Sequence, residues 1–219
     1  MIRTAISLGL FAGLAIGAGA QGAVVLAHYG FDNSSMSANV GSGTATATGT
    51  SSFFGGTTLG MPGSNSPPGS PSGQSGMNAV AIVGTGGGAL TISLSTMNYT
   101  NIVFSFASQR TATGGANAVV EYSLNGSSFT SLGTIVPGAS SPGFAGSSIN
   151  TSDYFFSFNA AGAANKGNVF FRITAAGASS ASGNQRFDNL VVAGDLVPAP
   201  GVLALAGFGG VIAARRRRA

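Results

Sequence analysis

Two aspartates at opposite ends of the central segment of the chain are the best candidates for metal chemistry. Asp32 follows the first β-rich segment, and Asp188 lies in the last one. If these segments are neighbouring strands, the two carboxylates approach each other, and calcium prefers carboxylate and carbonyl oxygens as ligands. Two like charges left close together repel, so a bound Ca²⁺, an arginine such as Arg186, or simple separation has to resolve them. Two alternatives stay open for Asp32 and Asp188: calcium ligands, or aspartates that hydrogen-bond and cap turns.

Groups that run hydrolytic chemistry are scarce in this sequence. Hydrolysis needs a proton shuttle near neutral pH or a pair of carboxylates with separated pKa values. His28 is the only histidine, there is no cysteine, and no Gly-x-Ser-x-Gly motif presents a nucleophilic serine. Alternation along Val24 to Phe31 places His28 on the face opposite Tyr29 and Phe31. We therefore expect no catalytic activity, and a glycan hydrolase or lyase stays only as the third alternative for function.

A glycine-rich segment, Gly84 to Ala89, imitates the Gly-x-Gly-x-x-Ala motif of dinucleotide-binding proteins. That motif requires a helix directly after it, because the helix N-terminus binds the pyrophosphate. Here Leu90 to Leu94 follows with strict alternation of apolar and polar residues, which indicates a strand. We therefore expect a flexible hairpin connection and no nucleotide at this position.

Apolar residues of the central segment recur with a period of two, which is typical of half-buried antiparallel strands. The pair Asn125-Gly126 predicts a hairpin turn between two of these strands, because both residues tolerate positive φ. The predicted strands cover Val24–Phe31, Leu90–Leu94, Ile102–Ala107, Val119–Leu124, Ser128–Leu132, Tyr154–Phe158, Val169–Ala175 and Arg186–Val192.

The stretch from about residue 37 to residue 76 is rich in glycine, serine, threonine and proline, and most of it is expected to be loop. Its core, Met61–Gly76, has too little apolar surface to offset the entropy of ordering. Phe53 and Phe54 are expected to dock a short edge strand within it. Roughly eight or nine short strands with polar turns predict an all-β fold, a jelly-roll-like antiparallel β-sandwich that forms one domain over residues 24–196.

Two short segments resemble elements of secreted galactose-binding-like and carbohydrate-binding-module β-sandwiches. They are Glu121–Phe129, which contains the predicted hairpin, and the closing strand Arg186–Val192. In the proteins they resemble, the closing strand pairs beside the first strand. The resemblance implies the sandwich fold and supplies the second reading of function, a carbohydrate-binding module.

The end of the chain has the composition of a membrane-sorting segment. Pro198 and Pro200 favour an extended backbone, and an apolar run of about 14 residues, Gly201–Ala214, follows them. That length approaches the ~20 residues needed to cross a bilayer, and basic residues after it stay on the cytoplasmic side. Those basic residues are Arg215, Arg216, Arg217 and Arg218. The alternative is a buried C-terminal element with a solvated basic end.

This order of Pro-x-Pro, apolar span and arginine cluster resembles the PEP-CTERM sorting domain of exported bacterial proteins. The resemblance covers residues 197–219 only, and Ala199 stands where glutamate is usual. It implies recognition by an exosortase-type membrane enzyme, which releases or re-anchors its substrate, commonly in bacteria that make exopolysaccharide. Before processing, the tail would anchor the protein in the membrane.

The N-terminus has the three parts of a secretory signal peptide. Arg3 supplies the positive region, Ala5–Ile16 the apolar region, and Ala18-Gly19-Ala20 a small-residue cleavage site, with a second site ending at Ala23. Residues 1–23 are therefore predicted to pass through the Sec export machinery and to be removed by signal peptidase. The protein is expected in the cell envelope, at the cell surface, or secreted.

The basic character of the whole chain, net charge +4 and pI ≈ 10.1, resides in its two ends. Between them the chain has net charge −1, so no basic stripe is available for nucleic acid. The four cations of this part are Arg110, Lys166, Arg172 and Arg186, and the five anions are Asp32, Glu121, Asp153, Asp188 and Asp195.

The expected function is that of an exported, non-catalytic protein of the cell surface or exopolysaccharide matrix, structural or adhesive, without an essential cofactor. Carbohydrate binding requires aromatic platforms and a few fixed polar groups. There is no tryptophan, and alternation places most aromatic residues in the core, leaving Tyr29, Tyr99, Tyr122 and Tyr154 as candidates. Arg110 and Arg186 can serve either as sugar contacts or in salt bridges.

Overall fold

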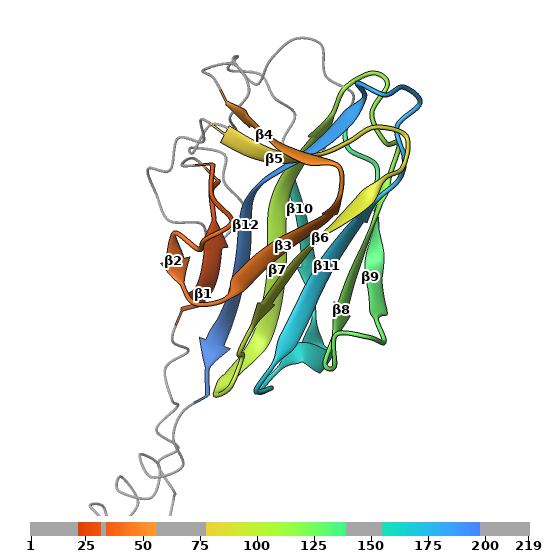
Figure 1. Cartoon of the computed structure of the whole chain (residues 1–219). Coiled ribbons are helices and arrows are strands. Elements are labelled where there is room, and N and C mark those ends of the chain that lie inside the picture. Colours follow the sequence, from red (N-terminus) through yellow and green to blue (C-terminus); the bar gives the residue numbers. More distant parts are fainter. Residues whose placement is uncertain (1–21, 32–33, 56–77, 139–154, 198–219) are drawn as a thin grey trace, which may run out of the picture. The chain divides into compact units, whose positions relative to one another are not determined.

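Two antiparallel β-sheets face each other as the two layers of a sandwich (Figure 1). The computed structural model describes residues 22–31, 34–55, 78–138 and 155–197, which belong to the compact unit Gly22–Val197. None of the helical segments among the described residues has the length and apolarity required to cross a membrane. The apolar tail segment and nearly all of the predicted signal peptide lie outside the described residues.

The described residues contain twelve strands and one short 3₁₀-helix. The strands are β1 Val24–Tyr29, β2 Val40–Gly41, β3 Thr44–Gly49, β4 Ser51–Gly55, β5 Asn78–Val83, β6 Gly88–Leu94, β7 Tyr99–Arg110, β8 Ala118–Ser123, β9 Thr130–Ile135, β10 Phe155–Asn159, β11 Val169–Ala175 and β12 Asn184–Leu196, and the helix is η3 Ala161–Ala163.

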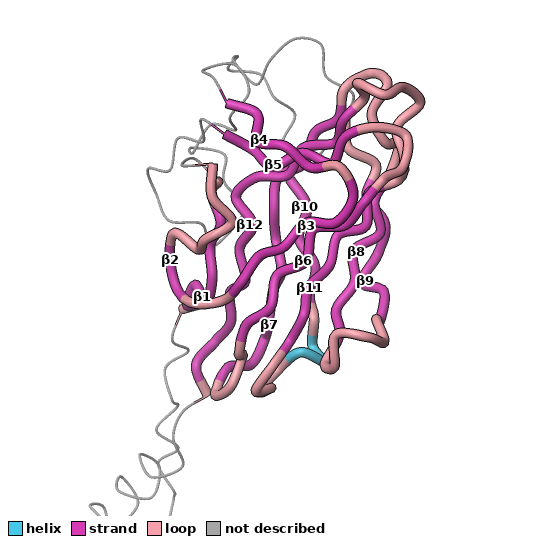
Figure 2. The backbone as a smooth tube through the Cα atoms, viewed as in Figure 1, coloured by secondary structure: helices cyan, strands magenta, loops and turns pink. Residues whose placement is uncertain are grey.

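The strands divide into two sheets, which we name sheet A and sheet B (Figure 2). Sheet A has the order β10-β7-β12-β1-β2, and β5 pairs with β12 and carries β4 at its other side. Sheet B has the order β3-β6-β11-β8-β9. The first strand pairs antiparallel with the last, from Val24 opposite Gly194 to Tyr29 opposite Leu190, which confirms the neighbours expected from sequence.

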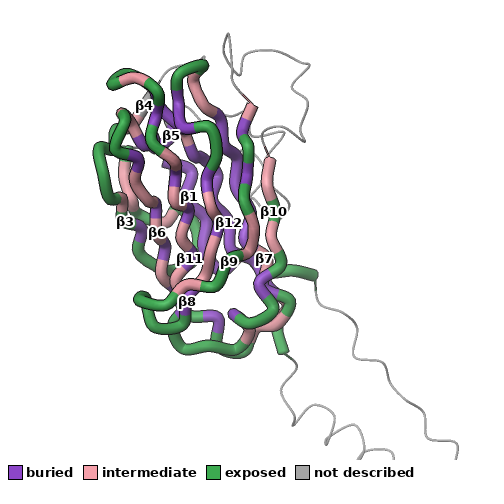
Figure 3. Tube along the Cα trace, turned by 90° about the vertical axis from the view of Figure 1, so that its right-hand side faces the viewer, coloured by how far each residue is buried: buried purple, intermediate pink, exposed green. Residues whose placement is uncertain are grey.

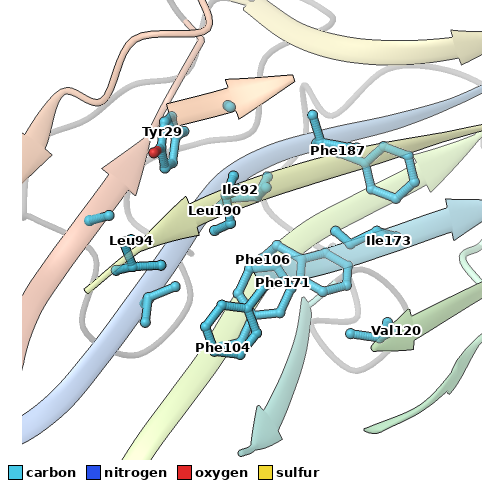
Figure 4. Close-up of a cluster of buried hydrophobic side chains, with 14 of the residues drawn as sticks. Tyr29, Ile92, Leu94, Phe104, Phe106, Val120, Phe171, Ile173, Phe187 and Leu190 are labelled. Carbon is cyan, nitrogen blue, oxygen red and sulfur yellow. The ribbon is translucent and has the colours of Figure 1, made fainter. Parts of the chain in front are cut away.

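Alternating side chains from both sheets fill the space between the layers (Figure 4). The central strands β7 and β12 of sheet A are mostly buried, whereas its edge strands β2 and β10 and most connecting loops are intermediate or exposed (Figure 3). The ring of Phe104 in sheet A lies 4.9 Å from the ring of Phe171 in sheet B, measured between centroids. Phe106 extends this aromatic contact to Phe187 in the same sheet. Because the sequence contains no cysteine, this burial rather than a disulfide joins the layers.

Two strands, β2 and β3, fall in the stretch that the sequence analysis assigned mostly to loop. Thr44–Gly49 falls in the stretch predicted to be mostly loop, yet it forms β3 and pairs with β6 over six residues. Its alternating threonine and alanine residues place Ala45 in the core and the threonines on the outer face, which is the period-two pattern at low hydrophobicity. The expected edge strand around Phe53 is confirmed as β4, while Met61–Gly76 lies outside the described residues.

The glycine-rich connection Gly84–Gly87 differs from the expected flexible hairpin. It joins β5 of sheet A to β6 of sheet B and therefore crosses between the layers. The amide of Gly84 donates to the carbonyl of Gly183 at 2.8 Å, and the carbonyl of Gly84 accepts from Ala178 at 3.0 Å. These bonds hold the connection against a second loop, and β6 follows it directly without a helix, so the nucleotide-binding arrangement is absent here.

The buried phenol of Tyr29 makes the free energy of unfolding depend on pH in the alkaline range. Burial raises the pKa of Tyr29 to about 12, from 10.0. Between those values the unfolded chain loses the proton while the folded protein keeps it, so the free energy of unfolding falls as pH rises. This contribution should reduce the free energy of unfolding by about 2 kcal/mol between about pH 9.5 and pH 11.5.

Tyr29→Phe isolates this contribution, because the buried hydroxyl of Tyr29 makes no hydrogen bond to the residues that the structure describes. At pH 8 the variant should match the wild type within about 1 kcal/mol in urea unfolding. At about pH 11.5 it should be the more stable protein by about 2 kcal/mol. A difference between the two proteins that does not change with pH would contradict the assignment.

Candidate ligand-binding groove

The outer face of sheet B presents hydroxyl, aromatic and charged side chains in two neighbouring rows. Residues opposite each other in antiparallel pairs share a face and lie about 5 Å apart. Successive rows along a strand are about 7 Å apart. One row runs Thr44, Ser93, Phe170, Ser123, and the next runs Thr46, Thr91, Arg172, Glu121.

The loop between β8 and β9 forms one wall over this face. The predicted hairpin is confirmed, but its connection is residues 124–129 rather than a tight turn at Asn125-Gly126. The reason is side-chain capping: the Ser123 hydroxyl accepts from the amides of Asn125 and Gly126 at 3.2 and 2.9 Å. Asn125 Oδ1 accepts from the amides of Ser127 and Ser128, both at 2.9 Å. Four backbone donors are thereby satisfied within the loop, which fixes its shape.

The fixed loop brings glycine and phenylalanine onto the sheet. Gly126 adopts φ +75°, and a Cβ at this position would lie 3.2 Å from the ring of Phe170. The ring of Phe129 lies over the guanidinium of Arg172, with 3.4 Å between the ring centroid and Cζ. This cation–π contact and the close approach of Gly126 place the loop directly against β11.

An ion pair fixes Arg172 from the other side. Its Nε and Nη2 both donate to Glu121 Oε2, at 3.0 and 2.9 Å. The two side chains are cross-strand partners in β11 and β8, and they are 32% and 17% exposed. Glu121 and Phe129 together therefore hold the guanidinium in one orientation, and its other N–H groups make no hydrogen bond to the described part of the chain.

Thr44, Thr46, Thr91, Ser93, Gly126, Phe129, Phe170 and Arg172 line a groove of about 370 Å³, which we name the threonine groove. This volume lies within the ~300–1,000 Å³ of small-molecule sites. The hydroxyls of Thr44 and Ser93 bond each other at 2.8 Å, whereas no hydrogen bond of the Thr46 or Thr91 hydroxyl is recorded within the described residues. The groove therefore offers an aromatic surface, hydroxyls that donate and accept, and an oriented guanidinium.

The residues predicted to bind calcium are only partly described. Asp188 lies in β12, fully buried, at the point where the ladder between β12 and β7 is interrupted by a bulge. Its Oδ1 accepts from the amide of Asn189 at 2.7 Å. Asp32 lies outside the described residues, and within those residues no three His, Asp or Glu side chains gather as a metal site. Calcium binding by Asp32 and Asp188 stays a prediction.

His28 is buried beside the same bulge. Its Nε2 lies 3.2 Å from Asn189 Oδ1, and Asn189 adopts φ 49°, a left-handed conformation that asparagine tolerates better than most residues. The expectation that His28 faces away from Tyr29 and Phe31 agrees with the core, which includes those two residues and not His28. The amide contact gives the imidazole a fixed partner in the bulge.

The two arginines left open by sequence have different surroundings. Arg110 donates to the carbonyls of Pro137, Thr111 and Ala112, at 3.2, 3.5 and 3.3 Å, and so connects β7 to two loops. Arg186 donates from Nε to Asn184 Oδ1 at 2.9 Å, and burial lowers its pKa. Within the described residues, Arg172 forms a salt bridge with Glu121.

The sequence analysis missed the groove because its parts are remote along the chain. Thr44, Thr91 and Arg172 come from three strands, one of them assigned to loop, and the tyrosines were considered as platforms instead of Phe129 and Phe170. Of those tyrosines, Tyr29 is buried, Tyr99 and Tyr122 pack against the core, and Tyr154 lies outside the described residues. A usable signal was present in the threonine alternation of residues 44–48.

No protein-family profile matches the sequence, and no curated protein matches it. Solved structures resemble the fold distantly. The carbohydrate-binding module TmCBM61, in complex with β-1,4-galactotriose, has a TM-score of 0.46 at 12% identity, covering 74% of this chain and 92% of its own. The K2 cleaved adhesin domain of Lys-gingipain has 0.43 at 12%, covering 78% and 97%. The CBM22-1 xylan-binding domain of Paenibacillus barcinonensis Xyn10C has 0.38 at 13%, covering 80% and 96%.

The calcium hypothesis predicts a change in thermal stability when the ion is removed. If Asp32 and Asp188 share Ca²⁺, adding a chelator should lower the Tm by about 5 °C or more, because the ion binds only the folded state and offsets the repulsion of two carboxylates. Asp188→Asn should abolish the dependence on calcium. Scanning calorimetry with and without chelator measures this, and Asp195→Asn is the matched control. An unchanged Tm would leave both residues as hydrogen-bonding aspartates.

Proposed function

We propose that this chain is an exported, non-catalytic β-sandwich of the cell surface or exopolysaccharide matrix, which binds polysaccharide through the threonine groove. The observation that carries the proposal is the groove itself. It combines an aromatic surface at Phe170, the hydroxyls of the cross-strand neighbours Thr46 and Thr91, and an oriented guanidinium at Arg172. The structural or adhesive role expected from sequence becomes, in this proposal, attachment to glycan.

Each part of the groove suits one feature of a sugar. The apolar face of a pyranose ring packs on the exposed part of Phe170, while its hydroxyls exchange hydrogen bonds with threonine side chains. The guanidinium of Arg172 donates to a ring or hydroxyl oxygen. No group in the lining acts as a general acid or base near neutral pH, since it consists of hydroxyls, glycine, phenylalanine and arginine. The ligand is therefore bound and left intact.

The affinity of such a site should be modest. An open groove gives about 0.3 kcal/mol per non-hydrogen atom, so a disaccharide of about 20 such atoms binds with Kd on the order of 0.1 mM. A polysaccharide binds more tightly than a disaccharide, because its many sugar repeats can contact many copies of the protein at once. Such weak, repeated contacts suit a protein of the matrix or surface.

Localisation at the surface forms part of the same proposal. Residues 1–23 are proposed as the signal peptide for the Sec export machinery and signal peptidase, and residues 197–219 as the PEP-CTERM-like tail for an exosortase-type enzyme. The support is their composition alone: small residues after an apolar run at one end, and Pro198, Pro200 and the arginine cluster at the other.

Removing two hydroxyls tests binding by the groove. Thr46→Val with Thr91→Val keeps the shape of both side chains and should weaken polysaccharide binding about tenfold, since each lost hydrogen bond contributes about 0.5–1.5 kcal/mol. Affinity gel electrophoresis against neutral and acidic polysaccharides measures the change. Thr174→Val is the matched control, on the same face of β11 outside the lining. Equal retardation of wild type and double variant would refute the site.

Mass spectrometry of both termini in the producing bacterium tests export and sorting. The mature chain should begin at Gln21 or Val24 and should lack Arg215–Arg218 in the surface or culture-fluid fraction. Replacing Pro198 and Pro200 by alanine should retain the unprocessed tail in the membrane fraction. A chain that starts at Met1 and stays in the cytosol would contradict this part of the proposal.

A further inference from the structure

We infer that the threonine groove selects neutral polysaccharides over anionic ones, because Glu121 already satisfies the charge of Arg172. This inference rests on the proposed function and names the ligand class for the same site. Three observations support it: the ion pair between Arg172 and Glu121, the uncharged character of the other lining residues, and the N–H groups of Arg172 that do not bond Glu121.

The ion pair removes the net charge of the groove. Of the described residues that line the groove, only Arg172 is charged. Glu121, outside the lining, accepts two of its N–H groups on a single oxygen. Phe129 covers one face of the same guanidinium. A carboxylate or sulfate approaching Arg172 therefore meets a cation that is already neutralised and shielded, with a like charge directly behind it.

Displacing Glu121 is unfavourable for an incoming anion. The Glu121 side chain is only 17% exposed, so breaking its contacts leaves a largely buried carboxylate without its partner. The other described cations do not line the groove: Arg110 and Arg186 bond elsewhere, and Lys166 lies in the loop that follows η3. The described lining therefore has no second positive charge to compensate an anionic ligand.

The groups that remain suit neutral hydroxyls. The guanidinium has five N–H donors, and Nη1 makes no recorded hydrogen bond within the described residues. Thr46 and Thr91, opposite each other and beside Arg172 in the same row, supply hydroxyls that both donate and accept. A sugar hydroxyl also does both, so it can accept from Arg172 and donate to a threonine at once, whereas a carboxylate only accepts.

Matched pairs of polysaccharides test the selectivity. The pairs are galactan with polygalacturonate, mannan with polymannuronate, and hydroxyethyl cellulose with carboxymethyl cellulose, tested with the purified exported chain in affinity gels. For at least one pair the neutral member should bind about tenfold more tightly than the anionic one at low salt. Its affinity should change by less than about twofold between about 20 and 300 mM NaCl.

Glu121→Gln tests the cause of the selectivity. Glutamine keeps an oxygen acceptor for Arg172 but removes the negative charge, so binding of the anionic member should rise about fivefold and become salt-sensitive, while neutral binding stays nearly constant. Asp195→Asn makes the same change of net charge away from the groove, beside Asn101, and should alter neither. Circular dichroism melts confirm that the variants fold.

The outcomes separate the two proposals. Tighter binding of the anionic members by wild type, lost in the Thr46→Val and Thr91→Val double variant, overturns the selectivity and leaves the proposed function standing. Binding of no polysaccharide, or binding that the double variant retains in full, overturns both. The wild-type comparison needs no variant, so a Glu121→Gln protein that fails to fold does not remove the test.

Discussion

The contact between Phe171 of sheet B and Phe104 of sheet A is the constraint on which the groove depends. Side chains alternate along β11, so the register that points Phe171 into the core points Phe170 and Arg172 outward, where they line the groove. A slip of one residue would bury the arginine and expose Phe171, at a cost of several kcal/mol for the buried charge alone. Burial between the layers therefore fixes the chemistry of the outer face as well as the fold.

Strands with a strong hydrophobic alternation were predictable from sequence. Val169–Ala175 forms β11 with the predicted bounds, and β12 includes the predicted segment Arg186–Val192 and extends it at both ends. These strands bury large apolar residues on one face, so the alternation of apolar and polar residues is enough to identify them as strands. Strand β3 buries only small alanines, and its threonines also suit a turn-rich loop, so the local signal was ambiguous without the partner β6.

The candidate site was less predictable than the fold, because its contacts join distant residues. Arg172 and Glu121 are 51 positions apart, and nothing in either local sequence indicates that β8 and β11 are neighbours. The hairpin turn was visible at Asn125-Gly126, but its six-residue shape depends on the hydroxyl of Ser123 and the amide oxygen of Asn125. Serine and asparagine are common in turns, but which backbone amides their side chains cap depends on the folded conformation of the loop.

In the proposed glycan binding, the preorganised loop is the source of specificity despite weak contacts. A mobile loop would lose conformational entropy on binding, which costs about 0.5–1.5 kcal/mol for each side chain that becomes ordered. Here four backbone amides of the loop are satisfied before any ligand arrives, and Phe129 already lies on Arg172. The contact of Phe129 with Arg172 also keeps the guanidinium paired with Glu121. The rigidity of the loop and the neutralised charge of the groove therefore depend on the same contacts. A ligand that required Arg172 to turn away would have to break both the ion pair and the aromatic contact, which restricts the groove to ligands that fit it as it stands.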